Sequence, residues 1–220
     1  MIRKLVFFVI LFLLSGCATG PGDAPRSEKT SAPPDFMNKT IDPPVERNLV
    51  AIAGFQNRST YSADKLWDTS GQLVTNHLMD MMYFRVVEWE KMKRLFDWRD
   101  LSTMNIIDSP EKRSKMRKIL LCELFLTGSV TYFDVNEQSK VSALSKSKTI
   151  ETTIRVDLSL QDAVTGEYVS AGKGAWTESQ TFSKGKLGTW DPGAADKALD
   201  YALRKALLQL TERYHRLAPK

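Results

Sequence analysis

The sequence predicts an α/β fold: a mixed sheet in which a parallel strand–helix–strand half is joined to a three-stranded antiparallel meander, with helices at its flanks. Three patterns predict it. An apolar run at 48–55 is followed by helical spacing at 67–81 and by a strand-like run at 84–88. From residue 123 the apolar period changes to two, and helical spacing returns at 194–214. This order favours a right-handed parallel crossover followed by hairpins.

The composition is that of an ordinary globular protein. Of the 220 residues 42% are apolar and 26% are charged, while Pro (9) and Gly (12) are too few for a low-complexity chain. A packed domain is therefore expected. The chain holds two His and two Cys, which leaves little material for metal binding or for acid–base chemistry near neutral pH. We therefore expect a protein that is not an enzyme, with no catalytic, metal or cofactor site.

The first residues are typical of a bacterial lipoprotein export signal. Arg3 and Lys4 precede the apolar run Leu5–Leu14, which is too short for a transmembrane helix of about 20 residues. The run ends in Leu-Ser-Gly directly before Cys17, which resembles a lipobox. We predict a signal peptide at 1–16 and lipidation of the Cys17 thiol. The alternative is that Cys17 is only a small residue near an ordinary cleavage site.

Such an anchor would hold the chain at a membrane without crossing it. Several acyl chains, as matured lipoproteins carry, bind a bilayer almost irreversibly, whereas one chain binds weakly. In lipoproteins of this kind the residue after the cysteine sorts between membranes, and Ala18 implies the outer membrane. We expect a lipid-anchored protein on the periplasmic side of the outer membrane, where it meets no nucleic acid.

A flexible tether is predicted for the lipidated N-terminal segment, 17–47. Six prolines lie there among Gly, Ser, Thr and charged residues, without apolar periodicity. A chain of this composition and about thirty residues reaches about 30 Å. The remainder, 48–220, is expected to form one folded periplasmic domain.

Two further helices are expected between the parallel half and the meander. Glu90–Asp97 continues as a helix after the second strand. The next helix begins after Ser109, which can cap it, with Pro110 at its first position and Glu111 near its positive end. This helix is expected to end at about Leu120.

The meander is predicted from alternating side chains. Ile150–Gln161 places mostly apolar residues at even positions and polar residues at odd positions, as in a strand with one solvated face. Glu123–Val135 precedes it, and the turn Thr165-Gly166-Glu167 leads into Tyr168–Gln180. The final helix, Ala194–Tyr214, carries an apolar stripe that is expected to pack on the sheet.

The positive charge is local. The chain has a formal net charge of +5, yet Lys91–Lys118 alone holds nine Lys or Arg against four acidic residues. This basic segment could face an anionic partner, but a solvated helix face is the favoured interpretation. Its aromatic residues, Trp89, Phe96 and Trp98, follow helical spacing, which favours core packing over a binding patch.

The remaining chemically notable residues have structural interpretations. His77 lies within the first helix and His215 near the end of the last, and neither has a second ligand at metal-binding spacing. Cys122 leads into a strand and is expected to be a buried, inert thiol. Gly172-Lys173-Gly174 lacks the Ser or Thr of a phosphate loop, so a close backbone approach explains it better. The Gln56–Asp64 loop is a candidate for contact with a neighbouring subunit or is an ordinary solvated loop.

The order of elements resembles that of the CsgG-like family of curli assembly and transport lipoproteins. Asn48–Arg58 resembles the first strand of the family and the Asn-containing loop after it. Leu126-Thr127-Gly128-Ser129-Val130 resembles a second family strand, and Ile154–Glu167, with its Thr-Gly-Glu turn, is the most specific match. The Ala-rich terminal helix completes the pattern.

The resemblance implies a lipoprotein that assists assembly or transport of a cell-surface component in curli-type secretion, through contacts with other envelope proteins or with further copies in a ring. The pore-forming family member contributes two long hairpins per subunit. The corresponding segments here, Asn136–Thr149 and Thr177–Asp191, are short and contain lysines, so we expect no full barrel. The alternative is an activator of a peptidoglycan synthase, a penicillin-binding protein, as for the relative LpoB.

Overall fold

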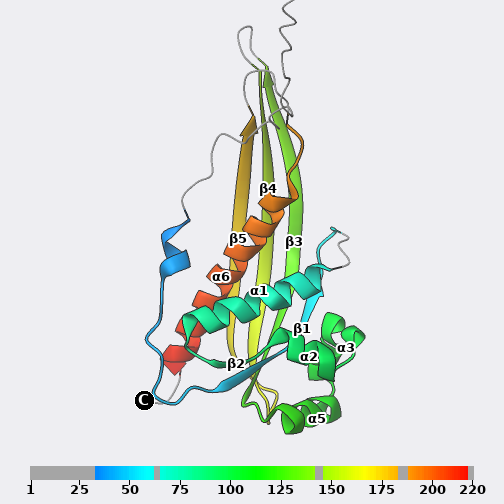
Figure 1. The fold of residues 1–220 in the computed structure, drawn as a ribbon, viewed down its shortest axis with the longest axis vertical. Coiled ribbons are helices and arrows are strands. Elements are labelled where there is room, and N and C mark those ends of the chain that lie inside the picture. The colour runs from blue at the N-terminus through cyan, green and yellow to red at the C-terminus, as the bar shows by residue number, and fades with distance from the viewer. Residues whose placement is uncertain (1–32, 62–64, 142–145, 183–187, 218–220) are drawn as a thin grey trace, which may run out of the picture.

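A five-stranded mixed sheet forms the centre of the molecule (Figure 1). The computed structural model describes residues 33–61, 65–141, 146–182 and 188–217. The strand order is β2-β1-β3-β4-β5. The strands are β1 (Leu49–Asn57), β2 (Arg85–Val87), β3 (Leu124–Val141), β4 (Lys146–Asp162) and β5 (Tyr168–Phe182). β1 pairs in parallel with β2 and β3, whereas β3, β4 and β5 are antiparallel. The predicted α/β fold with a parallel half and an antiparallel meander is confirmed.

Helices α1 and α6 lie against one face of the sheet, and the shorter helices gather beside β1 and at one end of the molecule (Figure 1). The short helices α3 and α4 were not predicted, because they span only six and four residues. The helices are η1 (Asp35–Asn38), α1 (Leu66–Met81), α2 (Trp89–Leu95), α3 (Trp98–Thr103), α4 (Asn105–Asp108), α5 (Pro110–Leu120) and α6 (Pro192–Leu217).

β1 is covered on both faces, as its continuous apolar run predicts. Val50–Phe55 is buried throughout. Gly54 leaves no room for a side chain, because the Leu101 carbonyl of α3 and Met104 lie against it. On the neighbouring strand, Gly128 of β3 makes room for the ring of Phe55. The parallel half is therefore packed tightly around the first strand.

Helix α5 begins and ends where its sequence predicts. The hydroxyl of Ser109 accepts a hydrogen bond from the Lys112 backbone N–H (3.4 Å), and Pro110 occupies the first turn. At the other end Leu121 takes a left-handed conformation (φ 54°), and its N–H donates to the Arg117 carbonyl. The capping residues thus set both ends of the helix.

The β3–β4 hairpin is longer than predicted, so the expectation of a short loop over Asn136–Thr149 is wrong. β3 continues to Val141 and β4 begins at Lys146, and the ladder runs without a gap between them. The outer pairs are polar, and the Lys148 ammonium lies 2.9 Å from the Glu137 carboxylate. Backbone hydrogen bonds and such cross-strand pairs extend a hairpin without any apolar alternation that the sequence could reveal. The hairpin therefore projects beyond the helices (Figure 1).

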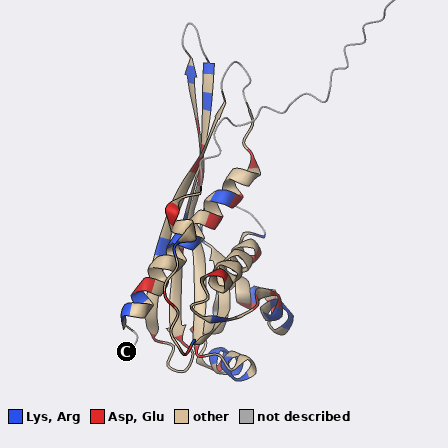
Figure 2. Cartoon of the chain, turned by 60° about the vertical axis from the view of Figure 1, so that its left-hand side comes forward, with Lys and Arg blue, Asp and Glu red and all other residues tan. Residues whose placement is uncertain are grey.

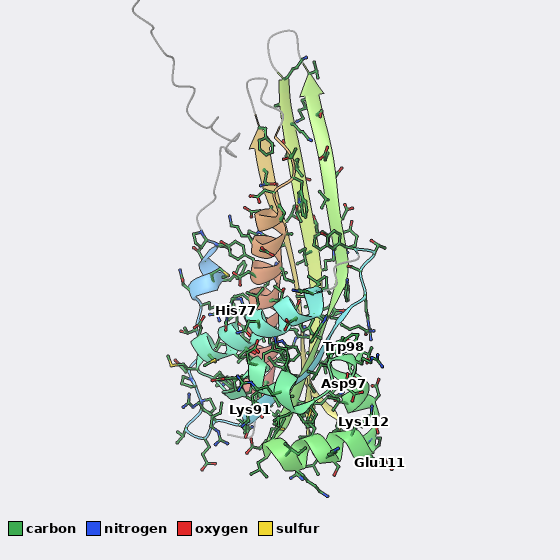
Figure 3. The ribbon with its side chains drawn as sticks, turned by 45° about the vertical axis from the view of Figure 1, so that its right-hand side comes forward. His77, Lys91, Asp97, Trp98, Glu111 and Lys112 are labelled. Atoms are coloured by element: carbon green, nitrogen blue, oxygen red, sulfur yellow. The ribbon has the colours of Figure 1, made fainter. Side chains whose placement is uncertain are left out.

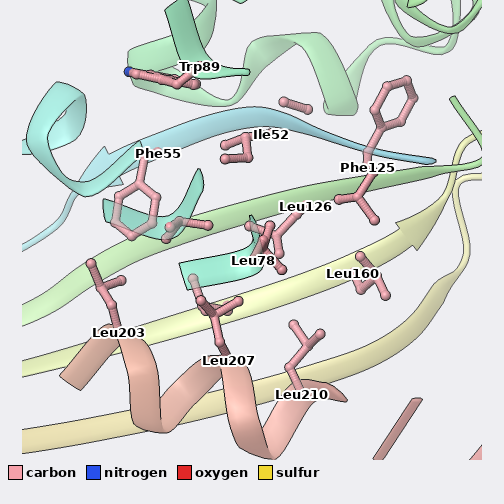
Figure 4. Close-up of a cluster of buried hydrophobic side chains, with 14 of the residues drawn as sticks. Ile52, Phe55, Leu78, Trp89, Phe125, Leu126, Leu160, Leu203, Leu207 and Leu210 are labelled. Carbon is pink, nitrogen blue, oxygen red and sulfur yellow. The ribbon is translucent and has the colours of Figure 1, made fainter. Parts of the chain in front are cut away.

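Helix α6 packs directly on β4 and β5, and two glycines allow it. A Cβ atom at Gly172 or Gly174 would collide with the backbone of α6, at the carbonyls of Ala206 and Ala202. The close backbone approach predicted for this Gly-Lys-Gly segment is confirmed. The apolar stripe of α6 then meets the sheet in the core shown in Figure 4, through Leu203, Leu207 and Leu210.

Side chains of α6 also occupy the outer edge of β5. The Gln209 amide oxygen accepts a hydrogen bond from the Lys173 N–H (2.7 Å), and the Arg213 guanidinium donates to the Ala171 carbonyl (2.9 Å). β5 is the last strand of the sheet. These two contacts satisfy main-chain groups that an edge strand otherwise presents to other chains.

The packed region begins before β1. Pro33–Arg47, which we expected within the tether, lies against α6 and the end of α1 and is called the strap below. Its η1 residue Phe36 packs edge-on against Trp176, and Lys39 pairs with Glu212 at 2.6 Å. The strap therefore belongs to the folded domain.

In the described part of the chain, no helix combines the length and the apolar character that membrane crossing requires.

Candidate interaction surface

The side chain of Asn57 bridges the loop that follows β1. The Asn57 Oδ1 atom accepts hydrogen bonds from the N–H (3.0 Å) and the hydroxyl (2.7 Å) of Ser59, and its Nδ2 donates to the Tyr61 carbonyl (2.7 Å). Residues 62–64, the end of the predicted contact loop, lie outside the described residues. The described part of the loop is therefore ordered by its own Asn, as in an Asx turn.

Tyr61 joins this loop to the base of the long hairpin. Its ring stacks on Phe133 of β3, with centroids 4.0 Å apart and an interplanar angle of 10°. Beside this stack lies a cleft of about 180 Å³. It is lined mainly by apolar and aromatic side chains, among them Tyr61, Leu66, Phe133, Ile154, Trp190 and Leu199.

The position of the cleft suits a protein contact. Tyr61 is partly exposed, and Arg58 beside it is exposed, with its Nε donating to Gln56 at 2.8 Å. An aromatic pocket with a polar, ordered rim is the arrangement that anchors a side chain of a partner protein. We call Gln56–Tyr61 together with this cleft the loop surface.

The basic segment is partly neutralised within the domain. Lys93 lies 2.9 Å from Asp68 and 2.7 Å from Glu90, and the hydrogen bonds to Glu90 and Asp68 raise the pKa of Lys93. Burial would raise the pKa of Asp68, but the hydrogen bonds from Lys93 and Trp89 outweigh it and lower this pKa. Lys112 pairs with Asp100 at 2.7 Å.

Three of the remaining cations of this segment lie together on α5, and Lys91, Arg94 and Arg99 lie on α2 and α3. Lys115, Arg117 and Lys118 are exposed, and no carboxylate of the described residues lies within 4.0 Å of their charged atoms. Figure 2 shows the resulting concentration of Lys and Arg at this end of the molecule. The α5 face is thus a solvated basic surface, as the sequence predicts.

The aromatic residues of the basic segment divide into core and surface. Trp89 is fully buried, donates from its indole to Asp68 at 2.7 Å and packs edge-on against Trp67, which confirms core packing. Trp98 is 58% exposed, so core packing is wrong for this residue. It opens the short helix α3 directly after its N-cap, Asp97, and both residues are labelled in Figure 3.

Each histidine lies close to a polar side chain of the domain. His77 on α1 is buried, and its Nε2 lies 2.7 Å from an oxygen of Asp200 on α6 (Figure 3 labels His77). The Nδ1 atom of His215 lies 3.1 Å from the hydroxyl of Tyr83. Within the described ranges, no group of three His, Cys, Asp or Glu side chains is placed to hold a metal ion.

Cys122 is 2% exposed. Burial in apolar surroundings raises the pKa of its thiol to about 12. The predicted burial of this thiol is confirmed, and its lack of reactivity stays a prediction. Cys17 lies outside the described residues, so its lipidation stays a prediction.

Sequence reasoning missed the strap and the residue that holds it. Arg204 of α6 is 4% exposed and donates to backbone carbonyls of Lys39 (2.8 Å) and His77 (3.4 Å). Burial lowers the pKa of this guanidinium. The available signal was a charged residue on an apolar stripe, three positions after Tyr201 and four before Leu208. Long charged side chains rarely lie there unless they have a buried partner.

Comparison with known proteins identifies one family. The family model described as "Curli production assembly/transport component CsgG" matches residues 35–215. A search of curated protein sequences found no match.

The solved structures to which this chain is similar include three bacterial proteins. The lipoprotein GNA1162 from Neisseria meningitidis is 13% identical, with a TM-score of 0.40, over 68% of this chain and 91% of that chain. The C-terminal domain of LpoB from Salmonella enterica is 17% identical, with a TM-score of 0.40, over 59% and 82%. The PelC dodecamer from Paraburkholderia phytofirmans is 13% identical, with a TM-score of 0.36, over 77% and 92%.

Proposed function

The chain belongs to the CsgG family of curli production assembly/transport components, and on that premise we propose that it is an outer-membrane-anchored lipoprotein facing the periplasm. Its task is to assist the assembly or transport of a cell-surface component. It does so by protein–protein contacts and without catalysis of its own. The observation that carries the proposal is the family match, which spans residues 35–215 and so includes every strand of the sheet and all of the strap except its first two residues.

The N-terminal sequence supports the location. The apolar run before Leu-Ser-Gly-Cys17 is that of a lipobox, and Ala18 follows the cysteine. A lipid anchor at Cys17 holds the domain at the outer membrane, because several acyl chains bind a bilayer almost irreversibly. The domain then works from the periplasmic side of that membrane.

The loop surface supports the mode of action. It combines an ordered polar rim, the stacked rings of Tyr61 and Phe133, and an apolar cleft. Such a surface takes a side chain of a partner, either an envelope protein or a second copy of this chain in a ring. No reaction chemistry is needed for that role.

The proposal is tested by cross-linking in intact cells followed by purification of the full-length protein. We expect cross-links to a secreted or surface-assembled component or to further copies of the chain, and Tyr61→Ala reduces them several-fold. Tyr168→Ala is the matched control, because Tyr168 is an exposed tyrosine at the start of β5, outside the loop surface. Capture of a penicillin-binding protein as the principal product, unaffected by Tyr61→Ala, contradicts the proposal and supports activation of a peptidoglycan synthase.

A further inference from the structure

The strap is the part of the domain that comes first after the predicted membrane anchor, and its contacts are those of a folded element. Phe36 lies edge-on to both Trp176 of β5 and Tyr201 of α6, with centroid distances of 5.6 and 6.3 Å. Trp176 and Tyr201 themselves meet at 5.2 Å. Aromatic pairs of this geometry attract each other beyond the effect of the area that they bury. Phe36 is therefore an anchor for the strap.

A second fixed point lies further along α6. The buried Arg204 guanidinium donates to the Lys39 carbonyl at 2.8 Å, and the Lys39 ammonium reaches Glu212 at 2.6 Å. Ile41 packs against the hydrophobic core. A buried guanidinium that lacks a hydrogen-bond acceptor destabilises the fold. Arg204 therefore favours the docked strap, in which the Lys39 carbonyl accepts its hydrogen bond.

The strap is also fixed where it enters β1. The Arg47 guanidinium donates to the Met82 carbonyl (3.2 Å), and its own carbonyl accepts from Arg85 (2.8 Å). Asn48 donates to the Tyr214 hydroxyl at 2.6 Å. Between these points Val45 is fully exposed. The segment thus follows α6 from Tyr201 to Tyr214 and is held at both ends.

We propose that the strap sets the distance between the domain and the membrane, by shortening the free connection to the lipid anchor and fixing the point from which it leaves. This inference rests on the proposed anchor at Cys17. With Pro33–Arg47 docked, only residues 18–32 separate Cys17 from the domain. Fifteen residues span at most about 50 Å, against about 100 Å for the thirty residues of an undocked segment.

The average span of the connection between Cys17 and the domain also becomes shorter when the strap is docked. A coil of the composition of this tether has a root-mean-square span of about 20 Å for fifteen residues and about 30 Å for thirty. Docking of the strap therefore draws the domain about 10 Å closer to the membrane. It also fixes the point of departure, because the connection then leaves beside η1, on the side of the molecule that carries α6 (Figure 1).

The test uses the chain from Cys17 onward, coupled through the Cys17 thiol to a maleimide lipid in a supported bilayer. This anchoring does not depend on lipidation in the cell, so failure of the strap and failure of the natural anchor are distinguishable. Cys122 does not compete, because it is buried and its pKa is raised to about 12. Neutron reflectometry measures the height of the domain above the bilayer, and trypsin cleavage after Lys39 reports whether the strap is docked.

Phe36→Ala combined with Ile41→Ser removes both apolar anchors, and Val45→Ala is the matched control within the strap. We expect the double variant to be cleaved after Lys39 at least tenfold faster and to stand about 10 Å further from the bilayer, while V45A behaves as wild type. If the double variant loses its native circular dichroism, Phe36→Ala alone takes its place. Rapid cleavage of the wild type, an unchanged height in the folded variant, or an equal shift in V45A overturns the proposal.

Discussion

The Nη2 atom of Arg204 donates a hydrogen bond of 2.8 Å to the carbonyl oxygen of Lys39, which lies 165 positions earlier in the chain. We expect Arg204→Met to lower the free energy of unfolding by about 1–3 kcal/mol, because the carbonyls of Lys39 and His77 lose their donor. Urea denaturation followed by tryptophan fluorescence measures it. Lys205→Met, at the exposed neighbouring position, is the control and is expected to change stability little. Equal effects of the two substitutions would show that the buried hydrogen bonds are not the cause.

Gly174→Ala is expected to destabilise the domain by about 1–3 kcal/mol. A Cβ atom at this position would collide with the Ala202 carbonyl, and neither β5 nor α6 can move without repacking the core. Thermal unfolding measures the effect. Gly193→Ala is the control, because an added methyl group there meets only the Asp191 side chain at 3.3 Å or more. A Gly174→Ala protein as stable as wild type would contradict the close packing of helix and strand.

The turn between β4 and β5 makes stability depend on pH. The Asp162 carboxylate accepts hydrogen bonds from the backbone N–H groups of Thr165 and Val164, both at 2.8 Å, and they lower its pKa below the ordinary value of 3.8 although burial opposes them. A carboxylate whose folded-state pKa is depressed contributes stability above its unfolded pKa, and this contribution is lost as the pH falls through the folded pKa. We expect Asp162→Asn to be less stable than wild type at pH 7.

The difference between Asp162→Asn and wild type should shrink as the pH is lowered from about 5 toward 2, because protonation removes the negative charge that distinguishes the wild-type side chain from the amide. Denaturation midpoints across this range test it. A difference that stays constant over the whole range would assign the effect to the shape of the side chain and not to its charge.

Cys122 is expected to stay unmodified in the folded protein. In a Cys17→Ser background it is the only thiol of the chain. Because its pKa is raised to about 12 and it is buried, very little thiolate is available at pH 8. Reaction with a chromogenic disulfide should be complete within minutes in denaturant and negligible over the same time without it. Rapid labelling of the native protein would rule out an inert core thiol.

Cys17→Ser is expected to release the protein from the membrane fraction. The substitution removes the thiol that receives the lipid, while the domain of residues 33–217 does not include it. Cell fractionation and the mass of the N-terminal peptide measure the outcome, and circular dichroism of the released protein serves as the control for folding. An unmodified wild-type N terminus, or a variant that stays in the membrane fraction, would refute the anchor.

The predictable parts of the fold are those in which local sequence and packing agree. Ser109 and Pro110 mark the start of α5 because capping is a local property, and the glycines at 172 and 174 indicate a close backbone approach because only glycine fits there. The hairpin beyond Asn136 has no such signal, since its outer pairs are polar and depend on the partner strand.

The strap was not predictable for a similar reason. Its composition is that of a linker, and its stability comes from residues far away in the chain, Trp176, Tyr201 and Arg204. The loop surface was found only in part. The sequence identified the loop, but the stacking of Tyr61 on Phe133 joins segments that are separated by more than seventy residues. Long-range contacts of this kind carry no local pattern.

Gln209 and Arg213 protect part of the outer edge of β5, the last strand of the sheet. Because they bind the main chain at Lys173 and Ala171, another strand cannot pair with that stretch without first displacing these two side chains. Loss of both side chains would leave these main-chain groups of the edge strand free to pair with another copy. The double variant Gln209→Leu, Arg213→Leu should therefore form β-sheet-rich aggregates under conditions in which the wild type stays in solution. The terminal helix thus protects this part of the domain against strand-to-strand association with other copies of itself.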